Sequence, residues 1–163
     1  MVSVDSGGVL HEKISGNTAG GIGSTAWRTY GTWSADFQVS SGAGKYVLLL
    51  AGKEGTPYNE LDIAEGKKGD SGRTKLMVTR HWGVGKTKMS QYFVSADFTK
   101  WHHIEVKWTA QAMTVSRDGR VVANYTTHVS KTPMHMTIQT AGANVGGAGA
   151  DAELQVKNLT VGA

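Results

Sequence analysis

Short apolar or alternating segments recur along the whole chain, separated by clusters of glycine, serine and aspartate. Alternation with a period of two indicates strands, and no window sustains the i, i+3, i+4, i+7 spacing of an amphipathic helix. The 163 residues include 22 glycines but only two prolines, which suits many tight turns and bulges between strands. We therefore expect an all-β chain that folds as a single domain, residues 1–163, with a two-layer core.

The strand pattern can be placed segment by segment. Asp118-Gly119 lies between two β-prone runs and predicts a hairpin, because a primed turn requires positive φ. The glycine-rich segment 142–149 lacks the lysine and helix start of a phosphate-binding loop and is expected to form a loop at the rim. The predicted strands are Val9–Ile14, Thr32–Val39, Lys45–Ala51, Asn59–Glu65, Lys75–Trp82, Met89–Phe93, His102–Trp108, Ala112–Arg117, Arg120–Thr126, Met134–Thr140 and Ala152–Val161.

One predicted strand carries three carboxylates within six residues, Glu60-Leu61-Asp62-Ile63-Ala64-Glu65. Like charges on one strand face repel, so this pattern requires a compensating role. Glu60 and Asp62 share a face by the period of two, whereas Glu65 falls on the opposite face. One extra residue around Ile63-Ala64, a β-bulge, would return Glu65 to the face of the other two.

With the bulge, three carboxylates on one face predict a retaining glycosidase, in which two carboxyl groups act as acid/base and nucleophile. The main carboxyl groups of such enzymes lie about 5–5.5 Å apart, which strand curvature and the long glutamate side chains would have to provide. Without the bulge, the same charges would protect a solvated strand edge from aggregation, with Glu65 pointing outward. A calcium site is a third interpretation, although ligands along one strand seldom surround an ion.

The acidic strand, in its bulged form Glu-x-Asp-x-x-Glu, resembles the signature of glycoside hydrolase family 16, which includes laminarinases, lichenases and agarases. Other segments resemble that family in order and spacing from Gly8 to Val161. They are Tyr30-Gly31-Thr32-Trp33-Ser34-Ala35-Asp36-Phe37, Thr79-Arg80-His81-Trp82-Gly83, Trp101-His102-His103-Ile104-Glu105-Val106-Lys107-Trp108-Thr109 and Arg117-Asp118-Gly119.

The resemblance implies a concanavalin A-like jelly-roll β-sandwich of two antiparallel sheets. It also implies that Glu60 is the nucleophile, Asp62 the assisting carboxylate and Glu65 the general acid/base in retaining hydrolysis of a β-linked glycan. The chain departs from the family pattern at Lys157, where an aspartate is common, so we predict no metal. Pro57-Tyr58-Asn59 replaces a tryptophan-containing segment, which changes the sugar-stacking surface.

Sugar sites combine aromatic faces with a few directed polar groups. Tyr58, Asn59, His81 and Trp82 flank the acidic strand and are predicted to bind substrate, together with Trp27. His81 and Trp82 are adjacent, so only one of them can face the acidic groups without another bulge. The resemblance favours His81.

Two further tryptophans and a histidine pair complete the candidates. Trp33 suits either a sugar platform or the core, whereas Trp108 follows an inward period of two and is expected in the core. His102 and His103 point to opposite faces and lack a third ligand, so one is expected to be packed and the other exposed.

Composition limits the remaining functions. The chain has no cysteine, and its net charge of +4 comes from scattered lysines and arginines, so neither a thiolate site nor nucleic-acid binding is expected. No segment suits a membrane span or a secretory leader, and we expect an extracellular or virion-associated protein. The leading hypothesis is a retaining endo-glycosidase that acts on a polysaccharide without a cofactor. The alternative is a non-catalytic carbohydrate-binding module, such as a virion attachment domain within a larger assembly.

Overall fold

The computed structural model describes residues 1–16, 18–53, 58–67, 70–83, 88–141 and 151–162. All regular structure in these ranges is β-strand, and none of it forms a helix that could span a membrane. The strands are β1 (Val2–Val4), β2 (Leu10–Ile14), β3 (Ala19–Gly23), β4 (Gly31–Val39), β5 (Lys45–Gly52), β6 (Tyr58–Gly66), β7 (Lys75–Gly83), β8 (Lys88–Ser95), β9 (His102–Trp108), β10 (Met113–Arg117), β11 (Arg120–Tyr125), β12 (Met134–Ala141) and β13 (Ala152–Gly162).

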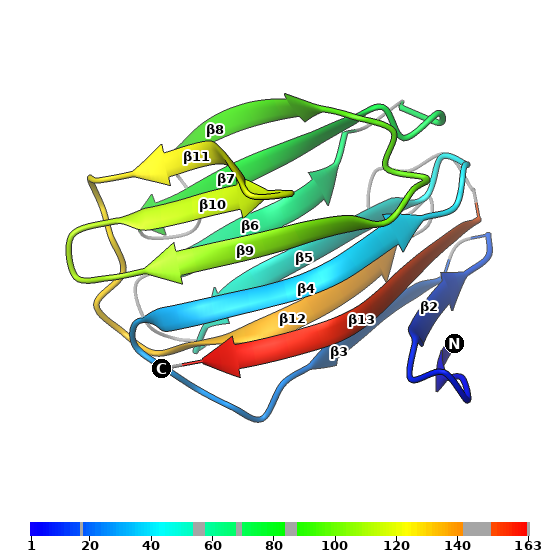
Figure 1. Ribbon diagram of the computed structural model, residues 1–163, viewed down its shortest axis with the longest axis horizontal. Helices are drawn as coiled ribbons and strands as arrows, with labels where there is room; N and C mark the ends of the chain where they lie inside the picture. Colours follow the sequence, from blue (N-terminus) through cyan, green and yellow to red (C-terminus); the bar gives the residue numbers. More distant parts are fainter. Residues whose placement is uncertain (17, 54–57, 68–69, 84–87, 142–150, 163) are drawn as a thin grey trace.

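Two antiparallel sheets are stacked face to face (Figure 1). One has seven strands in the order β1-β2-β13-β4-β9-β10-β11, and the other has six in the order β3-β12-β5-β6-β7-β8. Neighbouring strands in each sheet are often distant in sequence, as β13 is from β4 and β12 from β5. The predicted jelly-roll β-sandwich is confirmed.

Alternating apolar residues from both sheets fill the space between them. Trp33 and Phe37 of β4 meet Leu48 and Leu50 of β5 in one buried cluster, and all four side chains are fully buried. Trp108 is buried in the same cluster, as its period of two predicted. The alternation of apolar residues in these strands and the period of two that ends at Trp108 both arise because one face of each strand is buried.

All eleven predicted strands are present, and none of their ends differs from the prediction by more than two residues. The predicted hairpin is also confirmed, since Asp118 and Gly119 both have positive φ, 49° and 78°. Two strands were missed, the short exposed β1 and the glycine-rich β3. The predicted loop at 142–149 lies outside the described residues.

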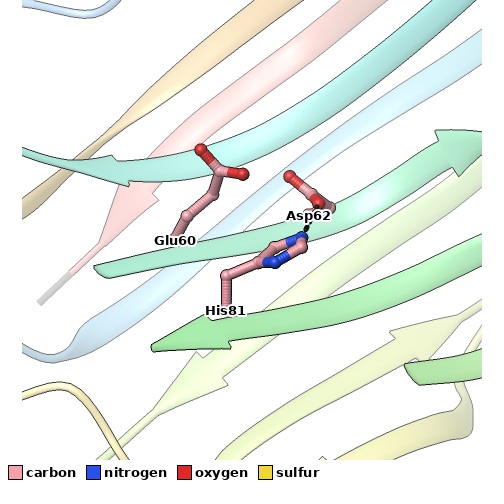
Figure 2. A group of neighbouring side chains, drawn as sticks. All are labelled: Glu60, Asp62 and His81. Carbon is pink, nitrogen blue, oxygen red and sulfur yellow. Dashed lines mark hydrogen bonds and ion pairs between the residues drawn. The ribbon is translucent and has the colours of Figure 1, made fainter. Parts of the chain in front are cut away.

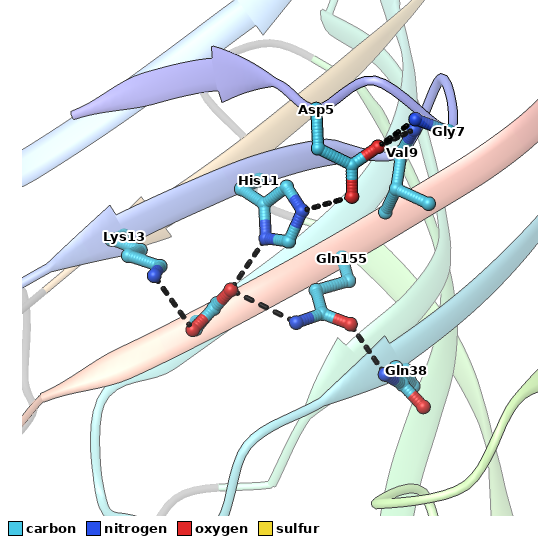
Figure 3. A network of polar contacts seen from close by, with 8 residues as sticks. Asp5, Gly7, Val9, His11, Lys13, Gln38 and Gln155 are labelled. Atoms are coloured by element: carbon cyan, nitrogen blue, oxygen red, sulfur yellow. Dashed lines mark hydrogen bonds and ion pairs between the residues drawn. The ribbon is translucent and has the colours of Figure 1, made fainter.

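The outer face of the seven-stranded sheet carries a polar network that ties the N-terminal strands to β13 (Figure 3). His11 contacts Glu153 at 2.6 Å and Asp5 at 3.1 Å through its two ring nitrogens. Lys13 and Gln155 also contact the carboxylate of Glu153, at 3.3 Å and 2.9 Å. These contacts hold β2 against the last strand of the chain.

Candidate active site

A β-bulge interrupts β6 at the predicted place. In the pairing with β5, Asp62 lies opposite Leu49 and Ala64 opposite Leu48, so Ile63 is an extra residue. The pairing with β7 shifts in the same interval, between Asp62 and Glu65. Because the bulge changes the alternation of side chains, it returns Glu65 to the face that carries Glu60 and Asp62.

The three carboxylates line one groove, on the face of the six-stranded sheet that points away from the core. The groove has a volume of about 310 Å³, and four adjacent strands, β12, β5, β6 and β7, contribute to it. His81 of β7 also lines it, as the resemblance favoured. The groove lining consists of Lys45, Tyr46, Val47, Leu49, Glu60, Asp62, Glu65, His81, Gln139, Thr140 and Ala141. Its volume falls within the range of ligand pockets, about 300–1,000 Å³.

Asp62 is the most deeply buried of these acidic groups, and His81 directs it. The side chain of Asp62 is 7% exposed, and its Oδ2 lies 3.0 Å from Nε2 of His81, while Glu60 extends beside it (Figure 2). Burial raises the pKa of Asp62 to about 6, and the neighbouring charge of Glu60 raises it as well, although the hydrogen bond with His81 opposes both. Asp62 can therefore hold a proton close to neutral pH and share it with Glu60.

A buried arginine holds the two strands behind the groove. The guanidinium of Arg80 donates hydrogen bonds to the backbone carbonyl of Glu60 at 2.9 Å and to the carbonyl of His81. It also donates to Oδ1 of Asn59 at 2.5 Å and to the carbonyl of His128 at 3.1 Å. Arg80 is 3% exposed, and burial lowers its pKa to about 10. These bonds fix the backbone from which Glu60 and His81 project.

Two predicted substrate-binding residues lie away from the groove. Asn59 points into the sandwich, where it is 9% exposed and donates a hydrogen bond to Thr132 at 2.9 Å. Trp82 of β7 pairs with Asn59 and lies on the same side of the sheet, where it stacks on His128 with ring centroids 4.3 Å apart. Both are adjacent in sequence to groove residues and therefore point to the opposite face. Neither side chain lines the groove in the structure.

The other two predicted substrate-binding residues differ in what can be described. The backbone of Tyr58 pairs with Gly83, and its side chain lies outside the described part of the structure. Trp27 is 44% exposed and stacks on His135, with ring centroids 4.1 Å apart. His135 lies opposite Ala51, which in turn lies opposite Glu60, so the Trp27–His135 stack extends the row of Glu60 toward β12.

The histidines differ in their surroundings. His102 and His103 bind separate carboxylates, Asp118 and Asp36, both at 2.7 Å, and their side chains are 15% and 45% exposed. One is packed and the other exposed, as predicted. Within the described ranges, ligand atoms of one group of three, Glu60, Asp62 and His81, lie within 4.8 Å of one another, close enough to hold a cation. The hydrogen bond between His81 and Asp62 accounts for two of these atoms without an ion.

Several groove residues were not identified from the sequence. Gln139 comes from β12, more than seventy positions after the acidic strand, and reaches the groove because it pairs with Val47, which pairs with Glu65. Lys45 lies at the start of β5 in the same groove. Only the strand pairing brings these residues together, and no local pattern marks them.

Comparison with known proteins supports the fold. No curated protein sequence matches the chain. Among solved structures, LamAcat from Zobellia galactanivorans has 15% identity and a TM-score of 0.78, with 97% of this chain and 78% of that chain covered. The β-glucanase of Bacillus licheniformis has 17% identity and a TM-score of 0.75, covering 96% and 82%. The laminarinase catalytic domain of Thermotoga maritima has 15% identity and a TM-score of 0.72, covering 95% and 79%.

At these identities the structural matches establish the sandwich fold alone. The sequence itself gives the assignment, because residues 2–157 match the profile described as glycosyl hydrolases family 16. This match includes the bulged strand, the groove and nearly all of both sheets. The chain belongs to glycosyl hydrolase family 16.

Proposed function

We propose that the chain is a retaining endo-glycosidase that hydrolyses a β-linked polysaccharide. Glu60 attacks the anomeric carbon while Glu65 protonates the departing glycosidic oxygen. Water then releases the glycosyl-enzyme, with Glu65 acting as base. Asp62 shares a proton with Glu60 and orients it, and His81 holds Asp62.

The bulge in β6 is the observation that carries this proposal. With the bulge, Glu60, Asp62 and Glu65 all line one groove, and a double displacement uses two carboxyl groups that flank the scissile bond. The raised pKa of Asp62 is consistent with its role beside Glu60, because a protonated carboxyl can donate a hydrogen bond to a nucleophilic carboxylate. Family membership supports a glycan substrate, and a related structure, LamA from Zobellia galactanivorans, was solved with laminaritriose and laminaritetraose.

The shape of the groove favours a chain over a single sugar. The groove is lined by four adjacent strands, and the Trp27–His135 stack lies along the row of Glu60. Trp27 lies beside a second hollow of about 490 Å³, formed with Lys53, Thr132 and Pro133. An exposed indole offers an apolar face for a pyranose ring. We therefore expect several consecutive sugars to bind across the sheet.

Azide rescue tests the two glutamate roles separately. An activated β-glycoside is supplied to Glu65→Ala and to Glu60→Ala in the presence of azide. Without the acid/base, azide attacks the glycosyl-enzyme and gives the β-glycosyl azide. Without the nucleophile, azide attacks the opposite face directly and gives the α-glycosyl azide. Recovery of the same anomer from both variants would contradict the assignment.

Glu105→Gln provides a matched control, because Glu105 lies on β9 in the other sheet and pairs with Lys107 at 3.6 Å. It should retain the activity of the parent protein. The experiment also separates hydrolysis from the alternative of a non-catalytic glycan-binding module. Such a module would bind a β-glycan saturably and release no new reducing ends, with or without azide.

A further inference from the structure

Three lysines lie at one end of three adjacent strands, beside the groove. Lys45 begins β5, Lys67 follows the last residue of β6, and Lys75 begins β7. The two ladders end at the pairs Val47–Glu65 and Gly66–Leu76, and each lysine lies one or two residues beyond these pairs. The three lysines therefore lie at the same end of the three strands, in a row across the sheet. On β6, this row lies two residues beyond Glu65.

All three lysines belong to the groove face. Lys45 lines the groove directly. The ammonium group of Lys67 lies 5.6 Å from the ring centre of Phe93, and Phe93 is in the row of Glu65 through its pairing with Met77. Lys75 is two residues from Met77 in a strand that pairs with β8 without a register shift. Two residues correspond to about 6.6 Å along a strand, and neighbouring strands are about 4.8 Å apart.

Among the residues that the structure describes, no carboxylate neutralises the positive charge of this row. Within the described part of the chain, none of the three lysines forms an ion pair with a carboxylate. Asp70 lies between Lys67 and Lys75 in the chain, and its carboxylate already accepts hydrogen bonds from the backbone of Lys75 at 2.5 Å and from Thr74 at 3.1 Å. Like charges in adjacent strand positions repel, so an anion would stabilise this arrangement.

An apolar surface adjoins the lysines. Phe93 is 62% exposed on the edge strand β8, and the ammonium group of Lys67 lies over it. An aromatic ring beside an ammonium group suits a sugar that has an apolar ring face and a negatively charged substituent. Neutral sugars would use the ring and leave the three charges solvated.

We infer that this groove accepts an anionic β-glycan, one whose sugars carry carboxylate or sulfate groups next to the site of Glu65. This inference rests on the proposed function for the position of the sugar chain and adds its chemical class. The groove favours a glycan over a nucleic acid, because Glu60, Asp62 and Glu65 occupy its centre and would repel a continuous row of phosphates. Substituents on a sugar chain can instead be confined to the lysine row.

The test compares a neutral β-1,3-glucan with its carboxymethyl derivative of the same chain length. Binding is measured by calorimetry with Glu60→Gln protein, and hydrolysis of both polymers is measured with the parent protein. Each exposed ion pair contributes little binding energy. We therefore expect the three lysines together to make the carboxymethyl polymer bind about tenfold more tightly than the neutral polymer at low salt. The preference should shrink at 0.5 M NaCl, because the Debye screening length is then only a few ångströms.

The triple variant K45Q/K67Q/K75Q should lose the preference, so that the ratio of the two affinities approaches one. The control K13Q/K100Q/K107Q has the same net charge but changes lysines outside the groove lining, and it should keep the preference. Equal affinities in the parent protein, or the same loss in the control, would overturn the inference. Competition by single-stranded DNA at equal charge concentration would overturn it too, since it would indicate general polyanion binding.

The two proposals can fail separately in this design. Cleavage of the neutral polymer without a preference for the charged one would reject the anionic class and leave the glycosidase assignment intact. Tight, lysine-dependent binding of the charged polymer without cleavage of either would reject catalysis and support the anionic class.

Discussion

Histidine–carboxylate pairs lie on the outer faces of both sheets, but the pKa of the carboxylate shifts in opposite directions in the two pairs. In the groove, His81 lies 3.0 Å from Asp62, and the pKa of Asp62 is raised to about 6. On the seven-stranded sheet, His103 lies 2.7 Å from Asp36, and the pKa of Asp36 is lowered. The same two residue types thus favour a protonated Asp62 on one face and an ionised Asp36 on the other.

The difference comes from burial and from the third group at each site. Asp62 is 7% exposed and has Glu60 as a neighbour, so burial and like charge both oppose its ionisation. Burial also opposes ionisation of Asp36, but this side chain is 23% exposed and the hydrogen bonds from His103 and Asn158 outweigh it. A nearby histidine therefore does not decide the charge of a carboxylate by itself.

The first and largest expected effect separates the two faces by activity. Asp62→Asn should lower kcat/KM on a β-glucan on the order of 100-fold, because the amide cannot exchange a proton with Glu60. Asp36→Asn is the matched replacement on the other face and should change kcat/KM by less than about twofold. Reducing-end assays on both variants measure the difference. Equal losses would mean that Asp62 acts only through stability.

The second effect concerns stability and has opposite signs on the two faces. Because the folded pKa of Asp62 exceeds its unfolded value, the folded state holds the extra proton and stability falls as pH rises from about 4 to 6. Asp62→Asn should therefore be more stable at pH 7, by up to about 3 kcal/mol. Asp36→Asn should be less stable at pH 7, by less than about 1 kcal/mol.

Urea unfolding between pH 4 and pH 8 measures both variants against the parent protein. The advantage of Asp62→Asn should shrink toward pH 4, where the parent carboxyl is protonated in the folded state and about half protonated in the unfolded state. An Asp62→Asn protein that is less stable than its parent at pH 7 would show that the hydrogen bond with His81 outweighs the cost of burial.

The smallest effect concerns the network of His11 on the seven-stranded sheet (Figure 3). The hydrogen bond with Glu153 and then that with Asp5 raise the pKa of His11. Its contribution to stability is therefore present below its unfolded value and is lost as pH rises through the raised folded value. His11→Asn should cost less than about 1 kcal/mol at pH 6 and almost nothing at pH 9. A cost that does not change between these pH values would assign the effect to packing.

The sequence was most informative where one strand face is buried. Alternation gave eleven strands, and the parity of Glu60, Asp62 and Glu65 located the bulge. The same parity places Asn59 on the opposite face from Glu60, and applying it to Asn59 would have removed that residue from the groove. Choosing His81 for the groove likewise left Trp82 on the packed face.

The features that the sequence did not predict depend on strand pairing between residues that are distant in the chain. Strand β3, Ala19–Gly23, has three glycines and no alternation, so it lacked a strand signal. Its composition is explained by its neighbour β12, since a Cβ on Gly23 would lie 2.9 Å from the ring of His135. The stack of Trp27 on His135 and the lysine row depend on strand pairings of the same kind.

The configuration of the first product tests the central claim most directly, because it reports whether the bulged strand works as a double-displacement site. Proton NMR during the first minutes of hydrolysis of a β-glucan distinguishes the two anomers of the new reducing end. The β-anomer should appear first and then mutarotate to the α-anomer. Initial formation of the α-anomer would contradict the role of Glu60 as nucleophile.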